Sequence, residues 1–117
     1  MKIQITIGEK KKVATLSNNP SAKAFYELLK NGSITIEMHD YGNFEKVGPL
    51  GTDIIQSNET ITTKPGDIIL YLGNQITIYY DINTWNFTLL GHIDNATNEN
   101  MREFLGEGNA TVTFSII

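Results

Sequence analysis

The sequence predicts a mainly β fold: a closed eight-stranded antiparallel β-barrel with two helices capping its ends. Segments in which polar and apolar residues alternate recur along all 117 residues, as in strands with one buried face. Tight turns separate consecutive segments, which favours antiparallel hairpins. So many short strands leave exposed edges unless the sheet closes, and a barrel also seats two amphipathic helices over its open ends.

The chain opens with an expected hairpin. Ile3, Ile5 and Ile7 share one face of the first strand, residues 8–11 turn the chain, and residues 12–16 return as the second strand. The alternation places the three isoleucines in the core.

A helix of about three turns is expected next, over residues 20–30. Asn19 can cap its first turn, Pro20 suits the first helical position, and Asn31-Gly32 can end it. Its apolar face comprises Ala22, Phe25, Leu28 and Leu29.

Residues 33–38 alternate strictly and predict a strand that buries Ile34, Ile36 and Met38. The pattern then degrades from residue 39 to residue 63, where several Gly and Pro residues interrupt it. A connection of this length in a small domain is often functional, so we expect part of any binding site here.

A second hairpin is expected from a strand over residues 68–72, a tight turn at Gly73-Asn74 and a strand over residues 75–80. After a connection over residues 81–85, another strand covers residues 87–93. The consecutive apolar residues 68–70 indicate burial on both faces, as when helices cover a barrel from outside. A short helix over residues 99–105 and a strand over residues 109–116 complete the chain.

The bulk composition predicts one soluble domain over residues 1–117. A net charge of −4 argues against a nucleic-acid partner, and no apolar run is long enough to span a membrane. The first residues alternate instead of forming a signal peptide, and the chain has no cysteine. These features favour the cytoplasm as its location.

Three segments carry a resemblance to a known family. Residues 19–25 (NPSAKAF) resemble the first helix of cyclophilins, and residues 90–93 (LGHI) with residues 101–106 (MREFLG) resemble the order of their last elements. Residues 66–80 are closer to small prokaryotic single-domain cyclophilin-like proteins. The resemblance implies the closed, helix-capped barrel, and true cyclophilins catalyse prolyl peptide isomerisation.

The residues that would carry this catalysis do not accompany the resemblance. In cyclophilins an arginine from the segment after the first helix lowers the barrier, but residues 34–50 contain none. The only arginine, Arg102, belongs to the last expected helix, and Lys46 lacks the planar fork of guanidinium donors. Trp85 resembles the tryptophan of the cyclophilin groove, yet the loop after it is too short to hold the family's histidine. The sequence therefore favours a non-catalytic protein, and prolyl isomerase is the only enzyme class that the resemblance suggests.

Other chemistry finds little support in the sequence. His39 and Asp40 are neighbours on an expected strand and point to opposite faces, and no histidine spacing predicts a metal site. No cofactor is expected. The large apolar residues instead predict a candidate groove beside the long segment, formed by Phe44, Leu50, Tyr80 and Trp85, with Tyr71, Tyr79 and Phe87 as further candidates. Alternation places either Tyr79 or Tyr80 in the core.

The sequence leaves three functions open. The favoured one is a cyclophilin-like domain that binds a small molecule or a peptide without arginine-dependent isomerisation. The second is a divergent peptidyl-prolyl isomerase with Lys46 or backbone amides as the electrophile. The third is a protein-interaction or self-assembly module, and the sequence does not decide the oligomeric state.

Overall fold

The computed structural model describes residues 1–117 and contains nine strands and two helices. The helices are α1 (Pro20–Lys30) and α2 (Asn98–Leu105). Neither could cross a membrane, because both are too short and too polar. The strands are β1 (Lys2–Ile7), β2 (Lys10–Leu16), β3 (Ile34–Tyr41), β4 (Glu45–Pro49), β5 (Glu59–Thr62), β6 (Asp67–Tyr71), β7 (Gln75–Tyr79), β8 (Thr84–Ile93) and β9 (Ala110–Ile116).

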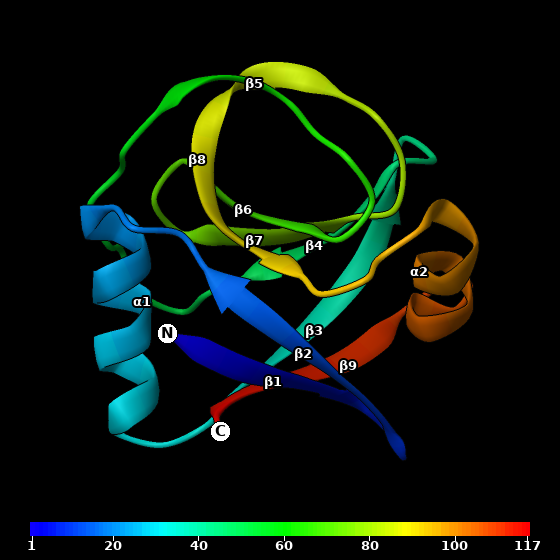
Figure 1. Cartoon of the computed structure of the whole chain (residues 1–117), viewed down its shortest axis with the longest axis horizontal. Coiled ribbons are helices and arrows are strands. Elements are labelled where there is room, and N and C mark those ends of the chain that lie inside the picture. Colours follow the sequence, from blue (N-terminus) through cyan, green and yellow to red (C-terminus); the bar gives the residue numbers. More distant parts are fainter.

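Eight strands form a closed antiparallel barrel in the order β2-β1-β9-β3-β4-β7-β6-β8, and β2 pairs with β8 to complete the ring (Figure 1). At this last pairing Gly91 lies opposite Leu16. A Cβ atom at Gly91 would stand 2.6 Å from the carbonyl oxygen of Thr15, so only glycine lets the two backbones approach this closely. The predicted closed eight-stranded barrel with two helices is confirmed.

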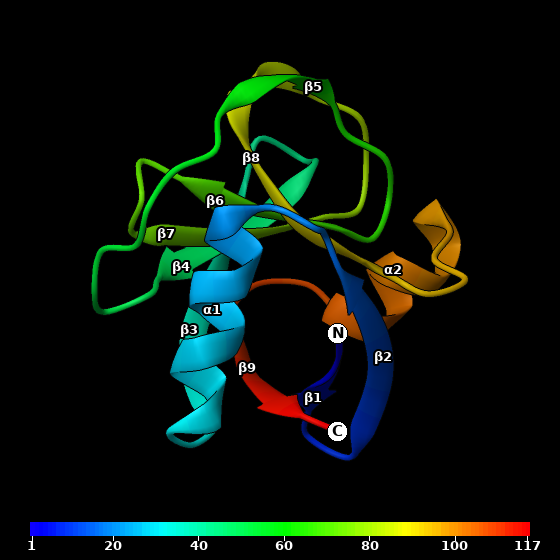
Figure 2. The same cartoon turned by 60° about the vertical axis from the view of Figure 1, so that its left-hand side comes forward.

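The ninth strand, β5, lies outside this ring and pairs only with the first half of β8, from Glu59 opposite Phe87 to Thr62 opposite Thr84. Figure 2 shows β5 and this half of β8 as an arch at the top of the view, above β6 and β7. The barrel therefore carries a two-stranded extension on one side.

The prediction of irregular structure over residues 39–63 is wrong in part, because this segment contains β4 and β5. The side chains of Glu45 and Lys46 on β4 are buried, so its pattern resembles a polar loop. β8 also begins earlier than predicted, at Thr84. Leu72, predicted to end a strand, instead occupies the turn after β6 with a φ of 56°.

The two helices lie on opposite sides of the barrel (Figure 1). Asn19 caps α1, because its side chain accepts a hydrogen bond from the backbone N–H of Ala22. Thr97 and Asn100 form a reciprocal capping box at the start of α2. Local capping and an apolar face thus define each helix, as predicted.

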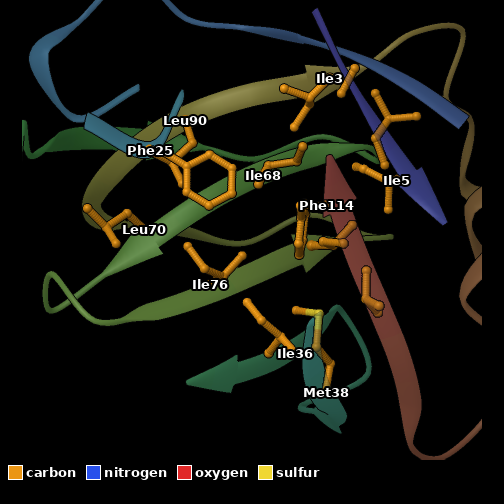
Figure 3. Packing of buried hydrophobic residues seen from close by; sticks show 14 of the residues in the cluster. Ile3, Ile5, Phe25, Ile36, Met38, Ile68, Leu70, Ile76, Leu90 and Phe114 are labelled. Carbon is orange, nitrogen blue, oxygen red and sulfur yellow. The ribbon is translucent and has the colours of Figure 1, made fainter. Parts of the chain in front are cut away.

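Buried apolar residues form two clusters on the two faces of the sheet. The main core fills the barrel, where Phe25 of α1 meets Ile68, Ile76 and Phe114 (Figure 3). The second cluster, Ile69, Tyr79 and Phe87, lies on the outer face. The both-sided burial of residues 68–70 is present, but aromatic side chains cover the outer face in place of helices.

Candidate functional site

A pocket of about 500 Å³ opens on the outer face of the barrel, over the second cluster. β7 shows which face this is, because Ile76 and Ile78 point into the main core and the alternate residues line the pocket. The first half of β8 contributes Trp85 and Phe87 to the lining. The lining residues are His39, Tyr41, Phe44, Glu45, Val47, Tyr71, Gln75, Thr77, Tyr79, Asn83, Trp85 and Phe87.

The β3–β4 hairpin supplies one edge of the pocket through its three-residue turn, Gly42-Asn43-Phe44. Gly42 and Asn43 have φ values of 68° and 69°, a left-handed backbone conformation that glycine and asparagine adopt more readily than other residues. The turn brings Tyr41 and Phe44 together, with ring centroids 6.2 Å apart in an edge-to-face arrangement. Phe44 is thereby directed back over the barrel wall.

An aromatic stack forms the floor. The rings of Phe44 and Tyr79 are parallel with centroids 5.8 Å apart, and Tyr79 meets Phe87 edge-on at 5.9 Å. Tyr79 is almost completely buried and holds the other two rings in place.

Two large aromatic residues at the mouth remain exposed. Trp85 lies on the arch, opposite Ile61 of β5, and is 58% exposed, while Tyr41 is 63% exposed. Together they leave apolar surface open to solvent beside a formed pocket, which is typical of binding sites.

Three hydrogen-bonded polar side chains, Asn83, Tyr79 and Glu45, form part of the pocket wall. The Tyr79 hydroxyl donates to Oε1 of Glu45 at 2.9 Å, and Nδ2 of Asn83 donates to the Tyr79 hydroxyl at 3.2 Å. Burial raises the pKa of Glu45 above its usual value, and the hydrogen bond from Tyr79 only partly opposes this. Burial is also the main cause that raises the pKa of Tyr79, so its hydroxyl is protonated at neutral pH.

Thr77 also lines the pocket and is 2% exposed, and its hydroxyl makes no hydrogen bond of good geometry, although it lies near enough to the Tyr79 hydroxyl to act against the rise in the pKa of Tyr79. Buried hydroxyl groups are usually satisfied, and orphaned ones are often found where a ligand or water binds. Thr77 lies two residues before Tyr79 on β7, so both side chains face the same space.

Of the four residues predicted to form the groove, two line the pocket. Phe44 belongs to its floor and Trp85 to its mouth. Leu50 and Tyr80 are buried in the main core instead. Tyr80 follows the last residue of β7 and turns inward, where its hydroxyl donates to Asp40 at 3.0 Å.

The sequence prediction missed several lining residues. Gln75 and Thr77 share one face of β7 with Tyr79, which was a candidate, and this period of two was the available signal for them. Glu45 gave no such signal, because an acidic residue beside a lysine is typical of an exposed loop.

The cations considered as electrophiles lie elsewhere. Lys46 is completely buried on the other face of β4, where its Nζ donates to Asp40 at 2.8 Å and to the Gly108 carbonyl at 2.5 Å. Arg102 of α2 is exposed and pairs with Asp81 at 3.2 Å, with its guanidinium 4.7 Å from the centre of the Tyr80 ring. Neither lines the pocket.

A closed eight-stranded barrel with a helix on either side and a pocket on its outer wall is a cyclophilin-like architecture. The model of the cyclophilin-like family matches residues 5–115, and the chain belongs to this family. A solution structure of a hypothetical protein from Archaeoglobus fulgidus is similar over 100% of this chain and 95% of its own, with a TM-score of 0.69. At 11% identity that likeness shows the fold alone. No curated protein matches the sequence.

We expect Gly42→Ala to disturb the pocket by moving Phe44. A Cβ atom at Gly42 would lie 2.5 Å from the Phe44 ring, and the positive φ adds a cost of about 1–2 kcal/mol in the free energy of unfolding. Gly8→Ala is the matched control, because Gly8 has a φ of 61° and open space around it. Gly42→Ala should lose at least as much stability as Gly8→Ala in urea melts, because it carries the contact with Phe44 in addition to the positive φ. Only Gly42→Ala should change the ring-current shifts of Tyr79 in NMR spectra, and an equal change in both variants would contradict this.

Proposed function

We propose that the protein binds a small organic molecule or a short peptide segment in the outer pocket, without arginine-dependent prolyl isomerisation. The single observation that carries this proposal is the aromatic pocket itself. Its floor is a packed stack of Phe44, Tyr79 and Phe87, and its mouth exposes Trp85. A volume of about 500 Å³ lies within the range of sites for small organic ligands, roughly 300–1,000 Å³.

The polar groups of the wall support binding more than this catalysis. Prolyl isomerisation by electrostatic stabilisation needs a donor aimed at the twisting amide. The cation that could replace arginine, Lys46, is held by Asp40 on the opposite face of β4. Thr77 and Asn83 offer hydrogen bonds that would orient a ligand within an apolar site.

Trp85 makes the proposal directly testable, because it is the only tryptophan in the chain and lies at the pocket. A fragment screen followed by tryptophan fluorescence and by ¹⁵N–¹H NMR should give ligands that shift Trp85 and residues of the floor. Trp85→Phe should preserve the NMR response while removing the fluorescence signal. Ligands that shift only residues outside the pocket, or a screen without ligands, would overturn the proposal.

Two further assays separate the other functions that the sequence left open. A protease-coupled proline assay at high protein concentration should give no rate above background, and a rate that depends on the protein would favour a divergent isomerase. Light scattering over a range of concentrations tests the interaction module. A mass that rises with concentration, together with protection of Trp85 from a fluorescence quencher, would favour self-assembly through this face over ligand binding.

A further inference from the structure

The lining of the outer pocket contains an acidic residue but no lysine or arginine. Glu45 is the only acidic residue in the lining. The other titratable groups that face the space are His39 and three tyrosines. An anionic ligand would therefore meet a carboxylate without a fixed cation to receive it, which disfavours that class.

Glu45 is unusual because its carboxylate is buried without a cation. The residue is 7% exposed, and Tyr79 is the hydrogen-bond donor to it, at 2.9 Å. The five ion pairs of the chain use other carboxylates. A buried charge is costly unless it is paired, so this carboxylate can gain considerably from a cation that enters the pocket.

Asp40 provides a comparison within the same hairpin. On the inner side of the wall, its carboxylate accepts a hydrogen bond from Nζ of Lys46 at 2.8 Å. It accepts another from the backbone N–H of Gly108 at 2.9 Å. Glu45, four residues beyond the end of β3, faces the outer side and has no such partner. The protein therefore neutralises the inner carboxylate with its own lysine and leaves the outer one open to the pocket.

The aromatic rings add a second attraction for positive charge. The faces of aromatic rings carry negative electrostatic potential, and cations within about 6 Å of a ring centre are stabilised by it. Rings of Phe44, Tyr79, Phe87, Trp85 and Tyr41 surround the same space as Glu45. The Thr77 hydroxyl, on the adjacent strand, makes no hydrogen bond of good geometry within the protein and can accept one from a donor placed there.

We infer that the pocket takes a ligand with an ammonium head on an apolar stem, its head meeting Glu45 and its stem lying among the aromatic rings. This inference rests on the proposed function, since it names the chemical class that the same pocket binds. A free organic amine and a lysine side chain within a peptide both present this chemistry. The pocket is open at the mouth beside Trp85 and Tyr41, so either source can reach it.

The test compares two probes of nearly equal shape, phenethylamine and 2-phenylethanol, by Trp85 fluorescence and NMR titration at neutral pH. We expect the amine to bind at least tenfold more tightly than the alcohol. An acetylated and amidated lysine tripeptide forms a second arm against the same peptide with norleucine. Preference for phenethylamine alone would identify a free amine as the source, and preference for the lysine peptide would identify a peptide.

Glu45→Gln should remove the preference of the amine over the alcohol, because the amide keeps an acceptor for Tyr79 but carries no charge. Asp53→Asn is the matched control, since it removes one exposed acidic charge from a residue outside the pocket and should leave the preference unchanged. Thermal melts should show Glu45→Gln folded and no less stable, because burial disfavours the wild-type carboxylate.

The outcomes separate the inference from the proposal on which it rests. If alcohol and amine bind the pocket equally, or if Glu45→Gln retains the preference, the ammonium inference is overturned and pocket binding stands. If fragments bind the pocket and both ammonium probes fail to bind, the inference is again overturned. If the fragment screen yields no ligand at the pocket, the proposed function falls with it.

Discussion

Asp40→Ala is expected to lower the free energy of unfolding by about 3–5 kcal/mol, because it leaves the ammonium group of Lys46 buried without a counter-charge. Lys46 is 0% exposed, and its remaining partner would be the Gly108 carbonyl. Asp40 also receives hydrogen bonds from the Tyr80 hydroxyl and the Gly108 N–H. A loss of this size is a large fraction of the stability of a small domain, about 5–15 kcal/mol.

Urea denaturation of matched variants measures this effect. Asp94→Ala is the control, because it removes an exposed ion pair with Lys2, for which we expect a loss below about 1 kcal/mol. The double variant Asp40→Ala/Lys46→Met should recover much of the stability, since it also removes the unpaired charge. A loss in Asp40→Ala no greater than that in Asp94→Ala would contradict the prediction.

The Asp40 carboxylate also makes the free energy of unfolding depend on pH. Partial burial acts to raise the pKa of Asp40, but the hydrogen bonds from Lys46, Tyr80 and Gly108 outweigh it and hold that pKa below its usual value. A depressed pKa in the folded state stabilises the protein above the unfolded-state pKa, about 3.9, and this contribution is lost as the pH falls. Wild-type protein should therefore lose more stability on acidification below about pH 4 than Asp40→Asn.

The Asp40 network also bears on function, because it engages Lys46, the lysine that the sequence offered as an electrophile. The network joins the β3–β4 hairpin to Gly108 in the turn between α2 and β9. Burial and the Asp40 carboxylate raise the pKa of Tyr80 to about 12, so Tyr80 remains a neutral donor within it. Lys46 was a predicted electrophile and Tyr80 a predicted residue of the groove. Both instead belong to the same hydrogen-bonded network inside the barrel.

Most of the fold was predictable because local signals agreed with the long-range structure. The alternation in β1, β2, β3 and β9 and the caps of α1 and α2 are readable from neighbouring residues alone. β4 was not readable, because the burial of Lys46 depends on Asp40 across the hairpin and that of Glu45 on Tyr79 of β7. Pattern analysis assigns such residues to solvent, and only the tertiary partners reverse this.

The candidate site was predictable only in part for a related reason. Phe44 and Trp85 flank turns or loops in the sequence, and large aromatic residues there indicate a surface role. Tyr79 and Tyr80 are adjacent and equally apolar, so the sequence alone could not decide which one faces the outer wall. The last bridge of β7, Tyr79 opposite Glu45, sets that choice, and it is a non-local contact.

Phe25→Ala is expected to lower the free energy of unfolding by about 3–5 kcal/mol, because it empties the contact between α1 and the barrel interior. Phe25 is 0% exposed and meets Phe114 of β9 edge-to-face with ring centroids 5.7 Å apart. Lys23→Ala, on the exposed face of α1, is the control and should change stability by less than about 0.5 kcal/mol. A cycle with Phe114→Leu should give a coupling energy of about 0.5–1.5 kcal/mol between the two rings.

Because the two apolar clusters are separate, Phe25→Ala also tests whether the pocket depends on the main core. Phe25 belongs to the main core inside the barrel, whereas the floor of the pocket belongs to the cluster on the outer face. At temperatures where Phe25→Ala remains folded, we therefore expect probe affinity at the pocket to match that of the wild type while the melting temperature falls. A loss of affinity in step with stability would show instead that the wall transmits changes in the core to the pocket, and that the outer aromatic stack is not held in place by the sheet alone.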